Sequence, residues 1–536
     1  MTGSSDTNSQ HATSEVVQTS GFVFLKGLTN GRKATILCIL CFALFLDTFN
    51  NNSLFAAIPH ISAQLGIRVS QSAWLLAAYQ LTFAALLLIS GRVTDLYNPK
   101  WVFTFGAIVM GIFNIAAGFI RAEIPLIIFR AIMGAGGALT IPSAQHLIVH
   151  MYPDPAEQAR AIALFGAMGA VGSVFGLIIG ALFVSFVSWP WVFYFSAIVS
   201  LVIAGGITVL VPNRQAGPSK ESAVSKLQRL DVLGVGLFAV SLILFIFALT
   251  SGSIVGWGSA QVIAPLVISV IVMIAFFGWE AYTPETRAAL PPKIWRYENV
   301  MILTIISLVP FMWWGSIFPM YAWLFETVYG WSAISTGVHF LPIAIGIIPA
   351  VAIATILQSK VPSKDIISFG FVLLLAGTVL LHWGNTKDKY WRIIFPGFVL
   401  GTAGAAFIYA TTNIALLANT PSGVSGIVSA LFVSVLQTGA AAGIAIVTSI
   451  QTSVEKHTAE GAMGFEGRAA GLWFLVGFDA LMMLLLFIFM TRSKPTTGSP
   501  PATVRDEESA STGSSTTERA AHESQTSSEK LAMGQP

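Results

Sequence analysis

The chain has 536 residues, of which 55% are hydrophobic and only 10% are charged, and its formal net charge at pH 7 is +3. A soluble domain carries roughly 25% charged residues, so this composition excludes a soluble globular protein. The positive charge is small and its basic residues stand at the edges of apolar blocks, which argues against nucleic acid as a partner.

Fourteen long apolar blocks follow one another along the chain. An α-helix needs about 20 apolar residues to cross a hydrocarbon core of about 30 Å, whereas a membrane barrel would show alternating strands of about 10 residues. The blocks therefore predict an all-α integral membrane protein with 14 transmembrane helices. In chain order, the spans are expected near residues 34–58, 72–91, 101–120, 126–149, 160–184, 190–211, 231–250, 262–279, 300–322, 333–357, 366–383, 391–417, 424–450 and 470–490.

Polar stretches divide these spans into six, two and six. The predicted N-terminal six-helix half covers residues 34–211, and the C-terminal half covers residues 299–492. Between them, residues 212–298 are interpreted as a linker that carries two accessory transmembrane helices, at about 231–250 and 262–279. Two bundles with an accessory hairpin between them are the expected domain organisation.

Residues 1–20 and 493–536 are rich in Ser, Thr, Glu and Gly and have few large apolar side chains, and the predicted tails are residues 1–33 and 493–536. Such segments cannot bury enough surface to fold alone, so both are expected to be disordered tails. Loops on the amino-terminal side of the spans hold most of the basic residues, for example Arg32 and Lys33. The positive-inside rule then places both termini in the cytosol, and we expect a monomer in the plasma membrane.

Asp47 is the first candidate for chemistry within the bilayer. Asn50 and Asn51 follow three and four residues later, a spacing that puts all three side chains on one helix face. An ionisable group in mid-span costs about 2.5 to 3.5 kcal/mol and usually faces a cavity. Because burial disfavours a charged carboxylate, this face predicts a site for proton coupling or substrate binding. The alternative is a carboxylate locked permanently in an ion pair with a helix-borne arginine.

Two further charged residues lie inside predicted spans. Arg130 precedes a run of small residues and is a second candidate for the proton or substrate site, although a long side chain near an interface can instead snorkel towards water. Asp479, in the last span, is either a second titrating group or a partner for a polar neighbour.

A short polar turn after the second span holds charges of both signs, at Gly91, Arg92, Asp95 and Lys100. This pattern favours a switchable ion-pair latch that gates transport, and a solvated turn is the ordinary alternative.

The fifth span carries three glycines four residues apart on one face, Gly172, Gly176 and Gly180. Small residues at this spacing let helix backbones approach closely in lipid. They predict a tight helix crossing, which packing alone can explain.

Other polar and aromatic side chains within the spans are candidates for a substrate cavity, although each one is more often a packed or interfacial residue. They are Tyr79, Gln80, Asn114, Gln145, Trp313, Trp314, His339, Tyr409, Asn413 and Gln437. A cavity of aromatics and amides with few charges favours an amphipathic organic substrate over a sugar or a polyanion.

Short motifs for other functions are absent from the sequence. There is no GxxxxGK[ST] phosphate loop, no HExxH and no G-x-S-x-G, so neither a nucleotide-driven motor nor the commonest hydrolases are indicated. Cys38 and Cys41 lie in an apolar helix and are interpreted as packing residues rather than a metal or redox site. We expect no enzyme activity, metal or cofactor, and transport that draws on a proton gradient.

Three motifs occur together in the order and on the helices that one family uses. They are the Gly91-x-x-x-Asp95-x-x-x-x-Lys100 turn, the Arg130-x-x-x-Gly134-x-Gly136 run and the fifth-span glycine ladder. Over roughly residues 34–492 the chain resembles the major facilitator superfamily, in its fourteen-helix drug:proton antiporter branch, and most closely its fungal members.

This resemblance implies a secondary transporter whose two halves rock about a central cavity, with Asp47 at the position of the family's first-helix aspartate. Its implied function is proton-coupled efflux of a small organic drug, toxin or secondary metabolite. The family's antiporter motif has proline after the glycine, and here Ser173 follows Gly172, which leaves the direction open. The alternatives are transport of a small inorganic solute such as borate or ammonium, and a non-transporting receptor or scaffold on the same bundle.

Overall fold

The computed structural model of the chain describes residues 28–152, 154–212, 231–284, 290, 292–358, 360–420 and 425–492. Within these ranges every regular element is helical, and 13 helical segments are long and apolar enough to cross a membrane. Helix α5 (Val69–Leu96) adds a shorter apolar stretch, Trp74–Leu87. The all-α, multi-pass membrane architecture is therefore confirmed, while the number fourteen stays a prediction. The predicted tails fall almost wholly outside the described residues.

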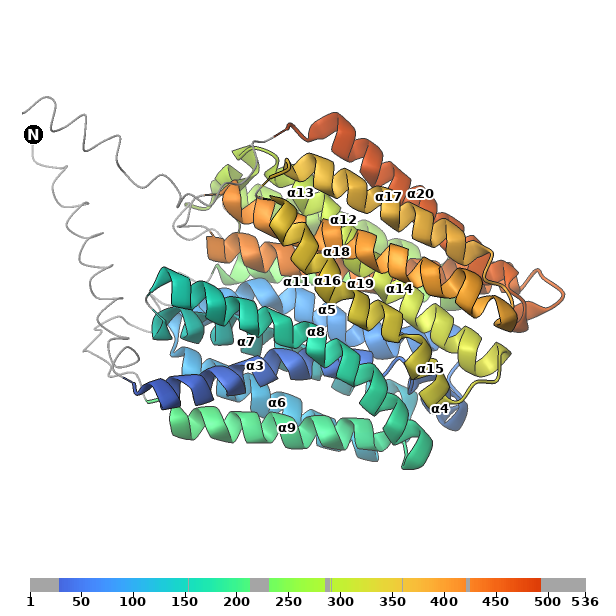
Figure 1. Cartoon of the computed structure of the whole chain (residues 1–536), viewed down its shortest axis with the longest axis horizontal. Helices are drawn as coiled ribbons and strands as arrows, with labels where there is room; N and C mark the ends of the chain where they lie inside the picture. Colours follow the sequence, from blue (N-terminus) through green and yellow to red (C-terminus); the bar gives the residue numbers. More distant parts are fainter. Residues whose placement is uncertain are drawn as a thin grey trace, which may run out of the picture.

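The amino-terminal bundle consists of α5 and the helices around it. These are α3 (Asn30–Asn52), α4 (Ile58–Leu65), α6 (Pro99–Phe119), α7 (Glu123–Met151), α8 (Pro155–Phe186) and α9 (Pro190–Leu210). Helix α7 packs against α5 and α6, and α3 packs against α8 and α9. In Figure 1 these helices lie together as the blue to green layer.

The carboxy-terminal bundle follows residue 291. Its elements are η1 (Pro292–Arg296), α13 (Val300–Ile306), α14 (Leu308–Trp323), η2 (Leu324–Val328), α15 (Ala333–His339), α16 (Leu341–Gln358), α17 (Ser363–His382), η3 (Lys387–Lys389), η4 (Tyr390–Ile394), α18 (Phe395–Ala418), α19 (Ser425–Glu455), η6 (Gly461–Met463) and α20 (Glu466–Phe489). Helix α18 packs against α16 and α17, and α19 packs against α14 and α20.

A pair of helices, α11 (Val232–Val255) and α12 (Ala260–Tyr282), comes between the two bundles in the sequence. Helix α11 contacts α5 of one bundle and α19 of the other, whereas α12 packs chiefly on α11 and turns most of its apolar side chains outward. The start of α11 and the end of α12 form what we call the base of the pair. There Asp231 Oδ1 accepts hydrogen bonds from the Gly234 amide at 3.1 Å and from Trp279 Nε1 at 2.8 Å.

Three predicted spans are broken where one continuous helix was expected. The span predicted at 34–58 ends at Asn52, and α4 begins five residues after Ser53 with Pro59 in its first turn. The spans predicted at 300–322 and 333–357 are interrupted at Ser307 and Phe340. Each of these two breaks lies shortly before a proline of the next helix, Pro310 or Pro342, which has no amide hydrogen to continue the ladder.

The helix ends define two faces of the molecule. The termini face carries the start of α3 and the end of α20, and the far face carries α4, the end of α8 and the α14–α15 connection (Figure 1). On the far face the bundles touch directly: the rings of Phe55 and Phe318 stack with centroids 4.7 Å apart. A Cβ on Gly337 of α15 would lie 3.0 Å from Ala181 Cβ of α8. Nearer mid-span, Ser434 Oγ of α19 donates to the Ala84 carbonyl of α5 at 2.7 Å.

Candidate functional site

Five polar side chains from three helices meet inside the amino-terminal bundle. We call Asp47, Asn50, Asn51, Tyr79 and Arg130 the buried polar cluster. None of the five is more than 8% exposed, and Arg130 is fully buried. Helix α3 contributes the first three, α5 contributes Tyr79 and α7 contributes Arg130. The helical spacing of the α3 residues therefore does bring them to one interior face.

The guanidinium of Arg130 is held on three sides. Its Nε donates to the Leu75 carbonyl at 2.8 Å, and its two terminal nitrogens donate to Asn50 Oδ1 and Asn51 Oδ1, each at 3.3 Å. Its carbon Cζ lies 4.6 Å from the centroid of the Tyr79 ring, which is within cation–π range. Arg130 thus points into the bundle and does not snorkel to the interface.

Asp47 is bound by a hydroxyl group instead of a cation. The Tyr79 hydroxyl donates a hydrogen bond to Asp47 Oδ1, and Asp47 makes no ion pair with Arg130. A direct, fully desolvated ion pair would fix both charges and resist exchange of a proton. The tyrosine contacts both the carboxyl group and the guanidinium and stands between them. The carboxyl group of Asp47 therefore has a hydrogen-bond donor without being fixed in an ion pair.

Two glycines of α7 make this arrangement possible. A Cβ on Gly137 would lie 2.6 Å from the Tyr79 hydroxyl oxygen and 3.3 Å from Asp47 Oδ1. A Cβ on Gly134 would lie 2.2 Å from the Tyr79 carbonyl oxygen. The small-residue run after Arg130 therefore lets α7 approach α5 closely enough for the polar groups to touch.

Asp479 lies apart from the buried polar cluster. It stands on α20, which packs within the carboxy-terminal bundle, and is 1% exposed. Its Oδ2 atom is buried and has no hydrogen-bond partner among the described residues. Both interpretations of Asp479, a second titrating group or a partner for a polar neighbour, stay predictions.

The predicted gating turn is largely helical. Helix α5 continues to Leu96, five residues beyond the predicted end at 91, so Gly91 and Arg92 lie on it. The connection to α6 is short, and Asn98 Oδ1 caps that helix by accepting from the Lys100 amide at 3.1 Å. The side chain of Asp95 lies outside the described residues, so the latch stays a prediction.

The glycine ladder faces α3. Cβ atoms on Gly172 and Gly180 would lie 2.3 and 2.4 Å from the carbonyl oxygens of Phe45 and Ser53, and one on Gly176 would lie 3.0 Å from that of Phe49. At the position where the family has proline, Ser173 Oγ accepts a hydrogen bond from Asn52 of α3 at 3.3 Å. The ladder is thus a close helix crossing beside the helix that carries Asp47.

The other cavity candidates are scattered through the fold. Trp313 packs in the carboxy-terminal bundle with Nε1 donating to Thr378 at 2.9 Å, and His339 lies in a cluster of rings, its centroid 4.0 Å from that of Trp331. Gln145 is exposed. Partly or fully buried positions are occupied by Gln80, Trp314, Tyr409, Asn413 and Gln437.

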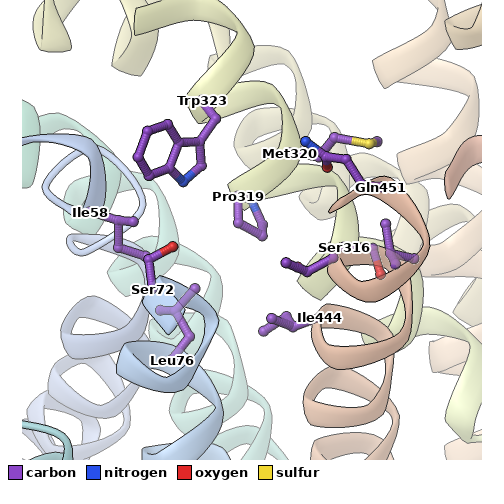
Figure 2. Close-up of a pocket in the computed structure, with 11 residues that line it drawn as sticks. Ile58, Ser72, Leu76, Ser316, Pro319, Met320, Trp323, Ile444 and Gln451 are labelled. Carbon is purple, nitrogen blue, oxygen red and sulfur yellow. The ribbon is translucent and has the colours of Figure 1, made fainter. Parts of the chain in front are cut away.

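A pocket does lie between the bundles, towards the far face (Figure 2). Ile58, Ser72 and Leu76 line one side, and the other side is formed by α14 and α19. The lining residues of these two helices are Ser316, Pro319, Met320, Trp323, Ile444, Val447, Thr448 and Gln451. The lining is apolar with a few hydroxyl and amide groups and carries no charged side chain, and none of its residues was among the sequence candidates.

The far face also carries a histidine–glutamate contact between the bundles, which is an ion pair when His60 is protonated. His60 Nδ1 of α4 lies 3.2 Å from Glu326 Oε2 of η2, with side-chain exposures of 45% and 5%. Contact with the Glu326 carboxylate raises the pKa of His60 above its usual value. Because this pair joins residues 266 positions apart in different halves, only the tertiary structure reveals it.

Residues 40–444 match the family model described as Major Facilitator Superfamily. The chain is 25% identical over 457 residues to puromycin resistance protein pur8 of Streptomyces alboniger, covering 84% of this chain and 89% of that protein. It is also 25% identical over 432 residues to a low affinity ammonium transporter of Saccharomyces cerevisiae, covering 80% and 83%. Among solved structures, an auto inhibited POT family peptide transporter superposes with a TM-score of 0.64 at 14% identity, covering 88% of this chain and 99% of that one.

Proposed function

Because the chain belongs to the Major Facilitator Superfamily, and is therefore a membrane transporter, we propose that it exports a small organic compound in exchange for protons. The observation that carries the proposal is the buried carboxyl group of Asp47, which accepts from the Tyr79 hydroxyl and is not neutralised by an ion pair. A group in this position gains or loses a proton when the bundles expose it to water on one side or the other.

The driving force is sufficient for such an exchange. A membrane potential supplies about 2.3 kcal/mol per charge per 100 mV, and each pH unit adds about 1.4 kcal/mol. One proton can thus sustain a concentration ratio of ten to several hundred. In this proposal Asp47 carries the proton, while Arg130, Asn50 and Asn51 form the polar wall next to it.

The uncharged pocket between the bundles supports an organic cargo. Trp323 and Met320 offer apolar surface, and Gln451 donates its amide to Glu455 at 2.8 Å, which leaves its carbonyl oxygen as an acceptor. Such a lining favours a neutral or amphipathic molecule with a hydrogen-bond donor. We place this pocket on the exit path, near the far face.

The proposal includes the finer topology expected from the sequence. In this proposal the chain has fourteen spans, of which α5 is the one beyond the 13 long apolar helices. Its two six-helix halves are joined by α11 and α12, and its termini face lies in the cytosol. The proposal also includes the fungal-type drug:proton antiporter branch, a monomeric state and the plasma membrane. Protons and a small organic molecule are the transported species, and no cofactor takes part.

The test uses the full chain in proteoliposomes with an imposed pH gradient and radiolabelled puromycin as the probe. We expect accumulation that collapses when a protonophore is added and that is lost in Asp47→Asn. The matched control is Asp365→Asn, an exposed acid-to-amide change at the termini face, where Asp365 pairs with Arg492 at 3.0 Å. Gradient-driven flux of normal size in Asp47→Asn would overturn the proposal.

A second candidate is transport of a small inorganic cation, favoured by the similarity to the yeast ammonium transporter. Radiolabelled methylammonium, measured in the same vesicles, separates the two. Movement of methylammonium without movement of puromycin would favour the second candidate. If neither probe moves, nor any member of a wider panel, a receptor or scaffold role is favoured instead.

A further inference from the structure

Tyr79 is the one member of the buried polar cluster that touches both charged groups. Its hydroxyl donates to Asp47 Oδ1, and the face of its ring lies 4.6 Å from Arg130 Cζ. Leu75, one turn earlier on α5, supplies the carbonyl oxygen for Arg130 Nε. The carboxylate of Asp47 on α3 and the guanidinium of Arg130 on α7 are therefore connected to each other through α5.

The position of the Tyr79 side chain is tightly defined. It is fully buried, its ring stacks on Phe83 with centroids 6.1 Å apart, and Gly137 closes over its hydroxyl oxygen. A side chain enclosed on these sides has little freedom to swing away from Asp47. Any change in the charge of Asp47 is therefore felt first at this hydroxyl group.

Helix α5 is also a main contact between the bundles. Ser434 of α19 donates to the Ala84 carbonyl, five residues after Tyr79, and Leu81 packs in a small core with Ile246 of α11 and Ala441 of α19. The same helix thus carries the partner of Asp47 and the contact surface for the opposite bundle.

We propose that Tyr79 is a positioning residue that sets the proton affinity of Asp47 and transmits its protonation state through α5 to the opposite bundle. This inference rests on the proposed function. When Asp47 is charged, it accepts the phenolic hydrogen bond. When a proton from water binds a carboxylate oxygen, that bond weakens, and the same proton later returns to water on the other side. Tyr79 keeps its own proton throughout.

The charged groups that act on Tyr79 are Asp47 from α3 and Arg130 from α7. The other helices packed on α5 are α4, α6, α11 and α19, and none of them brings a charge to this depth. Helix α11 has no charged residue, and the described charged or titratable residues of the other three, His60, Lys100 and Glu455, stand near the ends of their helices. A change of Tyr79 therefore acts on this pair alone.

The test is an infrared pH titration of the carboxyl C=O stretch in the purified full chain in lipid nanodiscs. The band that is missing in Asp47→Asn belongs to Asp47. Tyr79→Phe keeps the ring over Arg130 but removes the donor that favours the carboxylate. We expect the midpoint of that band to move by about one pH unit to more alkaline pH.

The matched control is Tyr321→Phe, because Tyr321 is equally buried and its hydroxyl donates to the Leu381 carbonyl at 3.1 Å, away from the cluster. This variant should leave the midpoint unchanged. An unchanged midpoint in Tyr79→Phe, or no titrating Asp47 band at all, overturns the inference.

The two proposals fail in different ways. If Asp47→Asn abolishes proton-driven export but Tyr79→Phe titrates like wild type, the positioning role alone is wrong. If Asp47→Asn exports normally while Tyr79→Phe shifts the band, the proposed proton coupling is wrong, and the hydrogen bond still sets the affinity of Asp47.

Discussion

His60 and Glu326 tie the two bundles together at the far face, with Nδ1 and Oε2 3.2 Å apart. Because Glu326 raises the pKa of His60, the pair is complete near the ordinary histidine value of about 6.5 while Glu326 is ionised, and it is lost as pH rises through the raised pKa of His60. We expect the far-face contact to loosen at alkaline pH. Spin labels at Ala63→Cys and Thr327→Cys, with Cys38 and Cys41 replaced, measure this opening as a longer, broader distance distribution.

His60→Gln should remove the pH dependence of that distance and leave it long at every pH. His457→Gln is the control, since His457 is an exposed histidine in the connection between α19 and α20. A wild-type distance that stays constant between acid and alkaline pH would contradict the assignment of the pair as a pH-sensitive contact.

The glycine ladder gives a second prediction. Gly172→Ala places a methyl group 2.3 Å from the Phe45 carbonyl oxygen, so α8 must move away from α3. We expect a loss of about 1–3 kcal/mol in stability, visible as a lower apparent melting temperature of the purified protein. Gly166→Ala on the same helix is the control, because no described atom outside its own stretch of helix backbone lies within 4 Å of the added carbon. Equal melting temperatures for the two variants would show that the crossing tolerates a methyl group.

A third prediction concerns the base of the α11–α12 pair. Trp279→Phe keeps an aromatic ring but removes the indole Nε1 group that donates to the Asp231 carboxylate. Hydrogen bonds to charged groups contribute about 1.5–3 kcal/mol, so the apparent melting temperature should fall. The exposed Trp391, whose indole nitrogen has no hydrogen-bond partner among the described residues, provides the control variant Trp391→Phe, which loses the same ring atoms. An unaltered melting temperature in Trp279→Phe would mean that other contacts hold the pair closed.

Asp479 provides a fourth prediction. An acid at mid-span costs about 2.5–3.5 kcal/mol on insertion scales, and none of the described residues bonds to the buried Oδ2 atom to offset that cost. Asp479→Leu should therefore raise the apparent melting temperature, whereas Asp365→Leu, at an exposed ion pair, should not. Loss of the proposed gradient-driven flux in the stabilised variant would identify Asp479 as a functional acid. A lower melting temperature would contradict the prediction, because it would require a stabilising contact of the carboxyl group.

Much of the architecture could be predicted from the sequence because lipid imposes one strong rule: each span must be long, apolar and helical. The face formed by Asp47, Asn50 and Asn51 followed from helical spacing within one segment. The breaks before Pro310 and Pro342 follow from the missing amide hydrogen, but long apolar blocks hide them when only hydrophobicity is counted.

The remaining parts of the site depend on contacts between distant segments. Tyr79 stands beside Gln80 in an otherwise mostly apolar stretch, and the sequence offers it only as one of ten cavity candidates, each of which is more often a packed or interfacial residue. Its role becomes visible only when α3, α5 and α7 are placed together. The same holds for His60 with Glu326 and for the pocket residues Ser72 and Gln451, which come from opposite ends of the chain.

Helix α11 touches α5 and α19 at once, and therefore covers the seam along which the two bundles meet. Any tilt of one bundle against the other has to slide beneath it. With α12 on its outer side, α11 separates this interface from the surrounding lipid on that flank. Lipid chains are therefore kept out of the contact between α5 and α19 when one bundle moves against the other.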